Sequence, residues 1–144
     1  MITKEQFIDK YCCFYVSDFH LEMILLPYIK DNLQKAKITI MTEESLENSL
    51  RVLLKKVNMK DSEKTDILNL NWNRNCAKIE ENNCSKNIII INGSLDYIEE
   101  KNKKIKELNL KNINIIDCYN INKFNINVLE IKKEYKSTLN TGLL

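Results

Sequence analysis

The side chains best suited to chemistry lie near the start of the chain. His20 is the only histidine, and close to it are two thiols, a hydroxyl and a carboxylate: Cys12, Cys13, Ser17 and Asp18. A cysteine nucleophile needs a base within hydrogen-bond reach of its thiol. If Cys13 faces the core of a sheet, that sheet separates its thiol from His20. We therefore expect buried structural cysteines. The alternative is a small enzyme with an unfamiliar site at the strand ends, using Asp18, His20 or a cysteine.

Phosphate-binding sites of the common kinds are excluded by the lack of glycine. A Walker loop and a dinucleotide fingerprint both need several glycines, so that backbone amides can approach the phosphates. The chain contains only Gly93 and Gly142, and the first expected strand is followed by Val16-Ser-Asp-Phe-His. A phosphoacceptor domain needs an aspartate at the end of its third strand, beside bound Mg²⁺. The third expected strand ends in Leu70-Asn-Trp-Asn instead, so we do not expect a receiver domain.

Metal and cofactor binding are not expected either. Cys76 and Cys84 have no Cys-x-x-Cys pair beside them, so a zinc site would have to add His20 or Cys118. Five cysteines without paired spacing are typical of reduced thiols rather than of a disulfide framework.

No apolar run approaches the roughly 18 residues of a membrane span, and the first residues lack the apolar core of a signal peptide. The expected location is therefore the cytoplasm, without a membrane partner.

Basic and acidic residues are mixed along the chain, 22 of the first kind and 20 of the second, for a net charge of +2. A nucleic-acid binder more often concentrates its lysines and arginines on one element. The one dense run of lysines, between positions 101 and 106, is flanked by glutamates. This pattern is typical of a solvated helix face, so we do not expect a nucleic-acid partner.

The 144 residues, 44% of them hydrophobic and 29% charged, fit one folded domain over 1–144. Apolar runs and turn residues predict strands that alternate with helices. The strands are expected at 12–16, 37–41, 66–71, 87–91 and 113–118. Helices are expected after Ser17 or Asp18, after Thr42, at 95–108 and at 126–138. The remaining segments are interpreted as a short helix or arm at 3–10, a loop at 58–65, and the least structured stretch at 73–86.

Such alternation predicts an α/β domain of three layers, with a mostly parallel five-stranded sheet and helices on both of its faces. The isoleucine run within 87–91 is the clearest signal of a strand buried on both sides. Pro27 is expected to kink or interrupt the first helix, because its ring removes a backbone donor. The order of the strands is not predicted.

Ligands of parallel α/β sheets sit at the carboxyl ends of the strands. Hydroxyls, amides, acids and two aromatic rings are expected to gather there: Ser17, Asp18, Thr42, Glu43, Trp72, Asn92 and Tyr119. Helix capping is the alternative role for the acids, and packing over the sheet edge for Trp72. No lysine or arginine is expected among these residues. The site would then suit a small neutral polar molecule or a loop of a partner better than a phosphate.

Short motifs along most of the chain resemble MEDS domains, the methanogen/methylotroph DcmR-type sensory domains. The resemblance rests on three groups of residues in the order of that family. They are Phe14-Tyr15 with Asp18, Leu26-Pro-Tyr-Ile and Asn32-Leu33; Lys37-Ile-Thr-Ile-Met-Thr with the helix of Leu50, Leu53 and Leu54; and Asp117-Cys118-Tyr119-Asn120 with Phe124 and the helix at 130–139. The chain departs from the family pattern at Asn32 (Gly), Asn120 (Asp) and Tyr135 (His).

The resemblance implies a RecA/KaiC-like core that has lost its phosphate-binding loop and acts in signalling. Members of this kind sense small molecules or regulate kinases, anti-sigma factors or transcription regulators. We therefore expect a non-catalytic sensory or regulatory domain without a cofactor. Its signal would leave through a signalling or transcription-regulatory partner, or through a homo-oligomer, because nothing in the chain looks like an output module.

Overall fold

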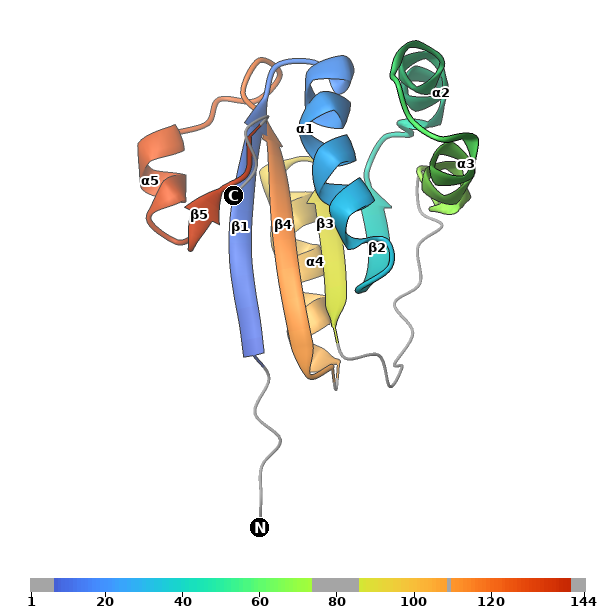
Figure 1. The fold of residues 1–144 in the computed structure, drawn as a ribbon. Coiled ribbons are helices and arrows are strands. Elements are labelled where there is room, and N and C mark those ends of the chain that lie inside the picture. Colours follow the sequence, from blue (N-terminus) through green and yellow to red (C-terminus); the bar gives the residue numbers. More distant parts are fainter. Residues whose placement is uncertain (1–6, 74–85, 109, 141–144) are drawn as a thin grey trace.

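The computed structural model describes residues 7–73, 86–108 and 110–140. Five strands form one sheet in which every neighbouring pair is parallel (Figure 1). The strand order is β2-β3-β4-β1-β5. The strands are β1 (Phe7–Tyr15), β2 (Lys37–Thr42), β3 (Asn87–Asn92), β4 (Asn112–Asn120) and β5 (Ser137–Thr138).

Helices cover both faces of this sheet, which confirms the predicted three-layer α/β class. One face carries α1 with α2 and α3 beside it, and α4 lies behind the sheet (Figure 1). The short α5 precedes β5 at the opposite edge from β2. The helices are α1 (Asp18–Asn32), α2 (Glu47–Lys56), α3 (Asp61–Asn69), α4 (Leu95–Glu107) and α5 (Val128–Lys132). No helix in these described segments has the length and apolar character needed to cross a membrane.

The isoleucine run forms β3, and all six residues of this strand are buried. Because successive side chains of a strand point to opposite faces, Ile88 and Ile90 pack in the core beneath α1, α2 and α3. Ile89 and Ile91 pack in the second core, beneath α4. A central strand between two helical layers must be apolar on both sides, so this part of the sequence predicted its environment correctly.

The helix α1 begins where expected, because the Ser17 side chain accepts a hydrogen bond from the backbone of His20. It continues through Pro27 to Asn32 without interruption. Proline removes one intrahelical hydrogen bond, but Leu21, Leu25 and other residues of the inward face are buried against the sheet on both sides of Pro27. Packing of that face is the larger contribution to the stability of such a helix.

The predicted strand at 66–71 is wrong, and so is most of the predicted loop at 58–65. Residues 61–69 form α3, with a capping box in which the backbone of Lys60 donates to Glu63 at 3.4 Å. Ile67 is the one fully buried residue of this helix, so the weak alternation around it did not mark a strand face. The helix α2 also starts later than expected, at Glu47, because Thr42 is the last residue of β2.

The predicted helix at 126–138 is wrong beyond Lys132. The chain turns after α5 and adds β5 beside β1. Two backbone hydrogen bonds of 2.8 Å hold this segment, from Lys136 to Lys10 and from Leu139 to Cys12. At the other end of the chain, residues 7–10 extend β1 rather than forming the expected helix or arm, and residues 3–6 of that prediction lie outside the described residues.

Candidate functional site

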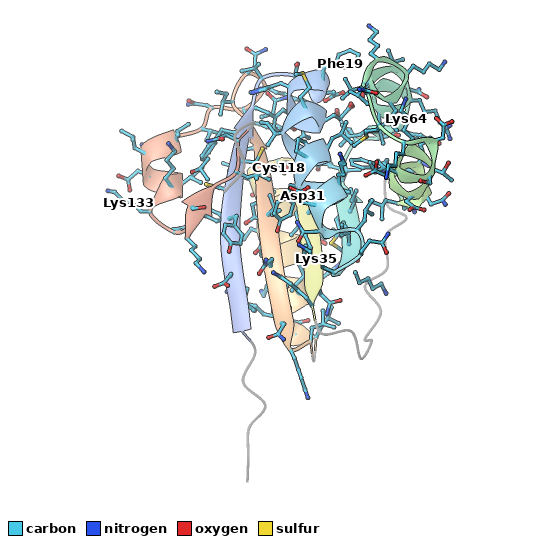
Figure 2. All side chains as sticks on the ribbon, in the orientation of Figure 1. Phe19, Asp31, Lys35, Lys64, Cys118 and Lys133 are labelled. Carbon is cyan, nitrogen blue, oxygen red and sulfur yellow. The ribbon has the colours of Figure 1, made fainter. Side chains whose placement is uncertain are left out.

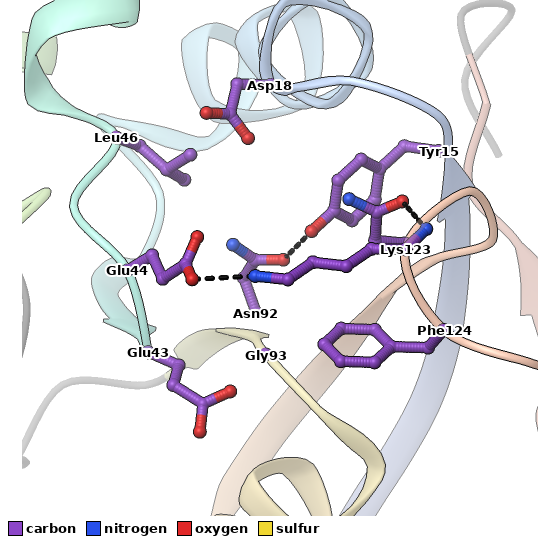
Figure 3. A pocket seen from close by; sticks show the side chains of 10 residues that line it. Tyr15, Asp18, Glu43, Glu44, Leu46, Asn92, Gly93, Lys123 and Phe124 are labelled. Atoms are coloured by element: carbon purple, nitrogen blue, oxygen red, sulfur yellow. Dashed lines mark hydrogen bonds and ion pairs between the residues drawn. The ribbon is translucent and has the colours of Figure 1, made fainter.

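The strand order places a topological switch point between β1 and β4. The chain leaves β1 toward β2 at one edge of the sheet, and it leaves β4 toward β5 at the other edge. Ligands of open α/β sheets bind in the crevice at the point where the connections from neighbouring strands run in opposite directions. A crevice lies at this point (Figure 3). Its lining comes from the carboxyl ends of four strands: Tyr15, Asp18, Glu43, Glu44, Leu46, Asn92, Gly93, Asn120, Lys123 and Phe124.

A chain of hydrogen bonds crosses the floor of this crevice. The Tyr15 hydroxyl donates to the amide oxygen of Asn92, and the Asn92 amide donates to the Thr42 hydroxyl at 3.1 Å. Thr42 in turn donates to the carbonyl oxygen of Glu44 at 2.5 Å. All three side chains are buried, and burial raises the pKa of Tyr15, so its hydroxyl remains a neutral donor. This chain of bonds ties together the ends of β1, β3 and β2.

An ion pair spans the crevice. Lys123 Nζ lies 2.7 Å from Glu44 Oε1 (Figure 3), and this hydrogen bond raises the pKa of Lys123. The remaining cavity has a volume of about 30 Å³, which is room for about one water molecule. Pockets for small molecules are roughly ten times larger. A small ligand therefore needs more room than the crevice offers in this conformation.

Lys123 also corrects the expectation that no cation lies at this edge. It belongs to the turn after β4, which folds back over the strand ends. The prediction from sequence considered only the residues directly after each strand. Lys123 lies three residues beyond Asn120, the end of β4, and was therefore not considered. The side chain of Asn120 shapes this turn by accepting backbone hydrogen bonds from Asn122 at 3.0 Å and from Lys123 at 2.9 Å.

Glu43 and Gly93 shape the wall of the crevice beside α4. A Glu43 oxygen accepts a hydrogen bond of 2.9 Å from the backbone of Ser94, the N-cap of α4. A Cβ atom on Gly93 would lie 2.6 Å from Cδ1 of Tyr97 and 3.0 Å from Cβ of Glu43. Only glycine therefore allows the end of β3, the first turn of α4 and the Glu43 side chain to lie so close together. The Glu43 carboxylate is thus engaged in capping, as the alternative interpretation of the sequence had it.

The structure brings most, but not all, of the seven predicted site residues together. Asp18, Glu43 and Asn92 line the crevice, Thr42 is bonded to Asn92, and Ser17 caps the helix that carries Asp18. Sequence reasoning missed Tyr15, Glu44, Lys123 and Phe124. Tyr15 had a usable signal, because it lies two residues after the buried Cys13 and so on the same face of β1.

Trp72 and Tyr119 lie elsewhere. Trp72 follows α3 rather than a strand; it is 2% exposed and its indole donates to the carbonyl oxygen of Ile67 at 2.7 Å. The ring of Tyr119 lies in the core on the α4 side of the sheet, stacked on Phe14 at 5.7 Å between centroids. The alternation of β4 directs Tyr119 to the face opposite that of Cys118.

Tyr119 belongs to a buried polar cluster on that second face. At its centre is Asp117, whose carboxylate is fully buried and accepts hydrogen bonds from Asn102 at 2.9 Å and from Tyr135 at 2.5 Å. Lys10 Nζ lies 3.5 Å from the same carboxylate, and the hydroxyls of Tyr119 and Tyr135 are bonded to each other. Burial raises the pKa of Asp117, against these stabilising contacts. The cluster joins β1, β4 and α4 to the chain just before β5.

His20 and the cysteines are occupied by structural roles. His20 Nδ1 accepts a hydrogen bond of 3.0 Å from the backbone of Val16, and Cys12, Cys13 and Cys118 are buried. Among the described residues that line the crevice there is no serine, threonine, cysteine or histidine. Within the same described segments, no group of His, Cys, Asp or Glu is arranged to hold a metal ion. Cys76 and Cys84, the remaining zinc ligands considered, lie outside the described residues.

Three exposed apolar side chains adjoin crevice residues in the sequence, and a fourth lies one turn further along α1. Val16, Phe19, Met23 and Ile121, which we call the apolar rim, are each between 40% and 54% exposed. The backbone of Ile121 donates to the carbonyl oxygen of Tyr15 at 2.9 Å, which places Ile121 beside Val16. Phe19 and Met23 are neighbours four residues apart on α1, and Phe19 lies in the first turn of this helix (Figure 2). Comparison of the chain with family models, with curated proteins and with solved structures finds no match.

Proposed function

We propose that this chain is a non-catalytic regulatory domain that binds a partner protein through the apolar rim. The observation that carries the proposal is the exposure of Val16, Phe19, Met23 and Ile121, which lie close in the sequence to residues of the crevice. Contiguous apolar side chains on the surface are typical of interaction sites. The roles of His20 and the described cysteines in the fold favour binding over catalysis, and a small enzyme remains the less supported alternative.

Charge beside the apolar rim indicates the chemistry of the partner. Asp18 lies in the first turn of α1, between Val16 and Phe19, and Glu43 and Glu44 lie across the crevice. Lys123 offsets only one of these carboxylates. A partner segment with apolar side chains flanked by lysine or arginine would complement this surface in both respects. We propose a signalling or transcription-regulatory protein as the source of that segment, and a second copy of the chain as the alternative.

A small polar ligand is a second candidate, favoured by the position of the crevice at the switch point. Such a ligand would displace the Lys123–Glu44 ion pair and face Tyr15 and Asn92. Opening of the crevice would also move the turn that carries Ile121, so the ligand would alter the apolar rim. The MEDS-like and RecA-like character of the chain, and its cytoplasmic location, remain parts of this proposal. They rest on the resemblance and on the spacing of the cysteines in the sequence.

The test compares binding partners of the wild-type chain with those of two matched variants. Phe19→Ser/Met23→Ser removes half of the apolar rim, whereas Val52→Ser/Leu95→Ser removes exposed apolar side chains from α2 and α4. We expect an identified signalling or transcription-regulatory protein to be retained by the wild type and the control, and lost with the first variant. Retention should weaken with added salt. Equal retention by both variants, or recovery of a metabolic enzyme complex, would contradict the proposal.

Self-association needs a separate measurement. Sedimentation of the purified chain distinguishes a second copy from another protein as the occupant of the apolar rim. A dimer that Phe19→Ser/Met23→Ser converts to a monomer would assign the apolar rim to a homo-oligomer interface. A monomer at all concentrations would leave the rim to another protein.

A further inference from the structure

A groove between α2 and α3 has a charge opposite to that of the crevice. It has a volume of about 270 Å³ and is lined by Arg51, Leu54, Lys55, Lys64 and Leu68. Arg51 and Lys55 are four residues apart on α2, and Lys64 and Leu68 are four residues apart on α3. Residues at this spacing are neighbours on one face of a helix, so each helix contributes one continuous strip to the groove.

The cationic groups of this groove are only partly neutralised. Arg51 donates two hydrogen bonds to Glu47, of 2.8 Å and 3.3 Å. In the described part of the chain, no ion pair involves Lys55 or Lys64, and no acidic residue lines the groove. Two ammonium groups from facing helices are therefore available to an anion.

The floor of the groove is apolar. Leu54 is buried and Leu68 is half-buried, and both belong to the core beneath α1, α2 and α3 or pack against it. An inorganic ion would leave the exposed part of Leu68 and the alkyl stems of Lys55 and Lys64 in contact with water. A ligand with a short hydrocarbon part would cover them and gain roughly 25 cal/mol for each Å² of apolar surface removed from water.

We propose that this groove binds a small amphipathic anion, with a carboxylate or phosphate head between Lys55 and Lys64 and a short apolar tail on Leu54 and Leu68. Hydrogen bonds between an ammonium group and an anionic oxygen are stronger than neutral ones. The volume of about 270 Å³ is near the lower end of ligand pockets, so it fits a short-chain acid better than a full lipid. This site is separate from the apolar rim, and it does not depend on the function proposed for that rim.

The chain carries its own reporter for this site. Trp72 is the only tryptophan, and its indole donates to the carbonyl oxygen of Ile67, the residue before Leu68 on α3. A ligand that contacts Leu68 should change the environment of this hydrogen bond and so the fluorescence of Trp72. Calorimetry gives the affinity independently of that signal.

The first experiment titrates octanoate and hexyl phosphate into the full chain at low ionic strength, where charge contacts are least screened. Octanol supplies a tail without charge, and acetate supplies a charge without a tail. We expect saturable binding of at least one of the two anions, with octanol and acetate at least tenfold weaker. Tighter binding of octanoate or of hexyl phosphate then identifies the head group. Failure of both anions to saturate at about 10 mM, or equal binding of octanol, would overturn the proposal.

The second experiment locates the site. Lys55→Gln/Lys64→Gln removes two charges from the groove, and Lys103→Gln/Lys106→Gln removes the same charge from exposed positions on α4, at the other face of the sheet. The first variant should weaken anion binding at least tenfold, and the second should leave it unchanged. Equal affinity of the two variants would overturn the assignment. Their thermal midpoints should match that of the wild type, which shows that a loss of binding is not a loss of folding.

Discussion

Tyr135 donates a hydrogen bond of 2.5 Å to the buried carboxylate of Asp117, and this contact fixes the chain just before β5 to the centre of the sheet. The ring of Tyr135 also lies under Lys10, with Nζ 5.0 Å from its centroid. Lys10 in turn approaches Asp117 at 3.5 Å. One phenol thus connects an ammonium group and a carboxylate that come from neighbouring strands.

Removal of this hydroxyl should destabilise the fold. In Tyr135→Phe the Oδ2 atom of Asp117 keeps only its longer contact with Lys10, so this buried acceptor loses its closest donor. Loss of such a bond costs about 1–3 kcal/mol, which urea denaturation measures as a lower midpoint. Tyr119→Phe is the matched control, because the Tyr119 hydroxyl contacts Tyr135 rather than Asp117. An equal loss in the two variants would mean that the Asp117 contact is not the important one.

Glu22 should make the stability of the protein depend on pH. Its side chain is fully buried on α1, beside the Ser49 hydroxyl, and burial raises its pKa from 4.5 to about 7. Below pH 4.5 the carboxyl is protonated in both the folded and the unfolded state. Between pH 4.5 and about 7 only the folded state keeps the proton, so the free energy of unfolding falls as pH rises. Above about pH 7 this contribution is constant.

Glu22→Gln should remove that dependence, because an amide is neutral at every pH. We expect the variant to be more stable than the wild type at about pH 8, by on the order of 2 kcal/mol, and similar to it at about pH 4. Urea denaturation across this pH range measures the difference. Glu99→Gln, an exposed change on α4, should leave the pH dependence unaltered. A wild-type stability that rises between pH 5 and 7 relative to Glu22→Gln would contradict the assignment.

Gly93→Ala should be destabilising by about 1–3 kcal/mol, because the new Cβ overlaps the Tyr97 ring. A double-mutant cycle isolates this cause. In a Tyr97→Ala background the ring is absent, so the cost of Gly93→Ala should decrease to what the contact with Glu43 imposes. An unchanged cost in that background would place the strain in the backbone instead.

Trp72→Ala should lower the stability of the domain by about 3–5 kcal/mol, as for other large core aromatics. The indole is buried beneath α2 and α3 and satisfies the carbonyl oxygen of Ile67. Trp72→Phe keeps most of the volume and should cost less. Thermal unfolding followed by circular dichroism compares the two, and a midpoint unchanged in Trp72→Ala would mean that this residue is not part of the core.

The parts of the fold that sequence predicts are those with strong local patterns. Residues 88–91 are all isoleucine and the strand at 113–118 is mostly apolar, so burial on both faces follows directly, and the class of the fold follows from their alternation with helices. The edge elements lack such patterns. Ser137 and Thr138 form β5 by pairing with β1, whose residues lie more than 120 positions earlier in the chain. Tyr135 holds the segment just before them.

The candidate site was predictable in part for the same reason. Residues directly after a strand, such as Glu43, follow from the rule that carboxyl ends gather at one edge. Lys123 requires knowledge of how the turn after β4 folds back. The position of Tyr119 depends on the face of the sheet to which its side chain points, and a shift of one residue exchanges the two faces. Trp72 was misplaced because the helix before it was interpreted as a strand.

The brevity of β5 divides the outer side of β1 into two stretches that differ in their exchange with solvent. The backbone carbonyls of Lys10 and Cys12 face β5 and accept the amides of Lys136 and Leu139, the residues on either side of it. Ile8, two residues before Lys10, has the same orientation. In the described part of the chain no strand pairs with Ile8 on that side. Its amide hydrogen should therefore exchange with deuterium much sooner than that of Cys12. The first part of β1 is thus an unpaired edge on which another strand could add, whereas the second part is protected by pairing.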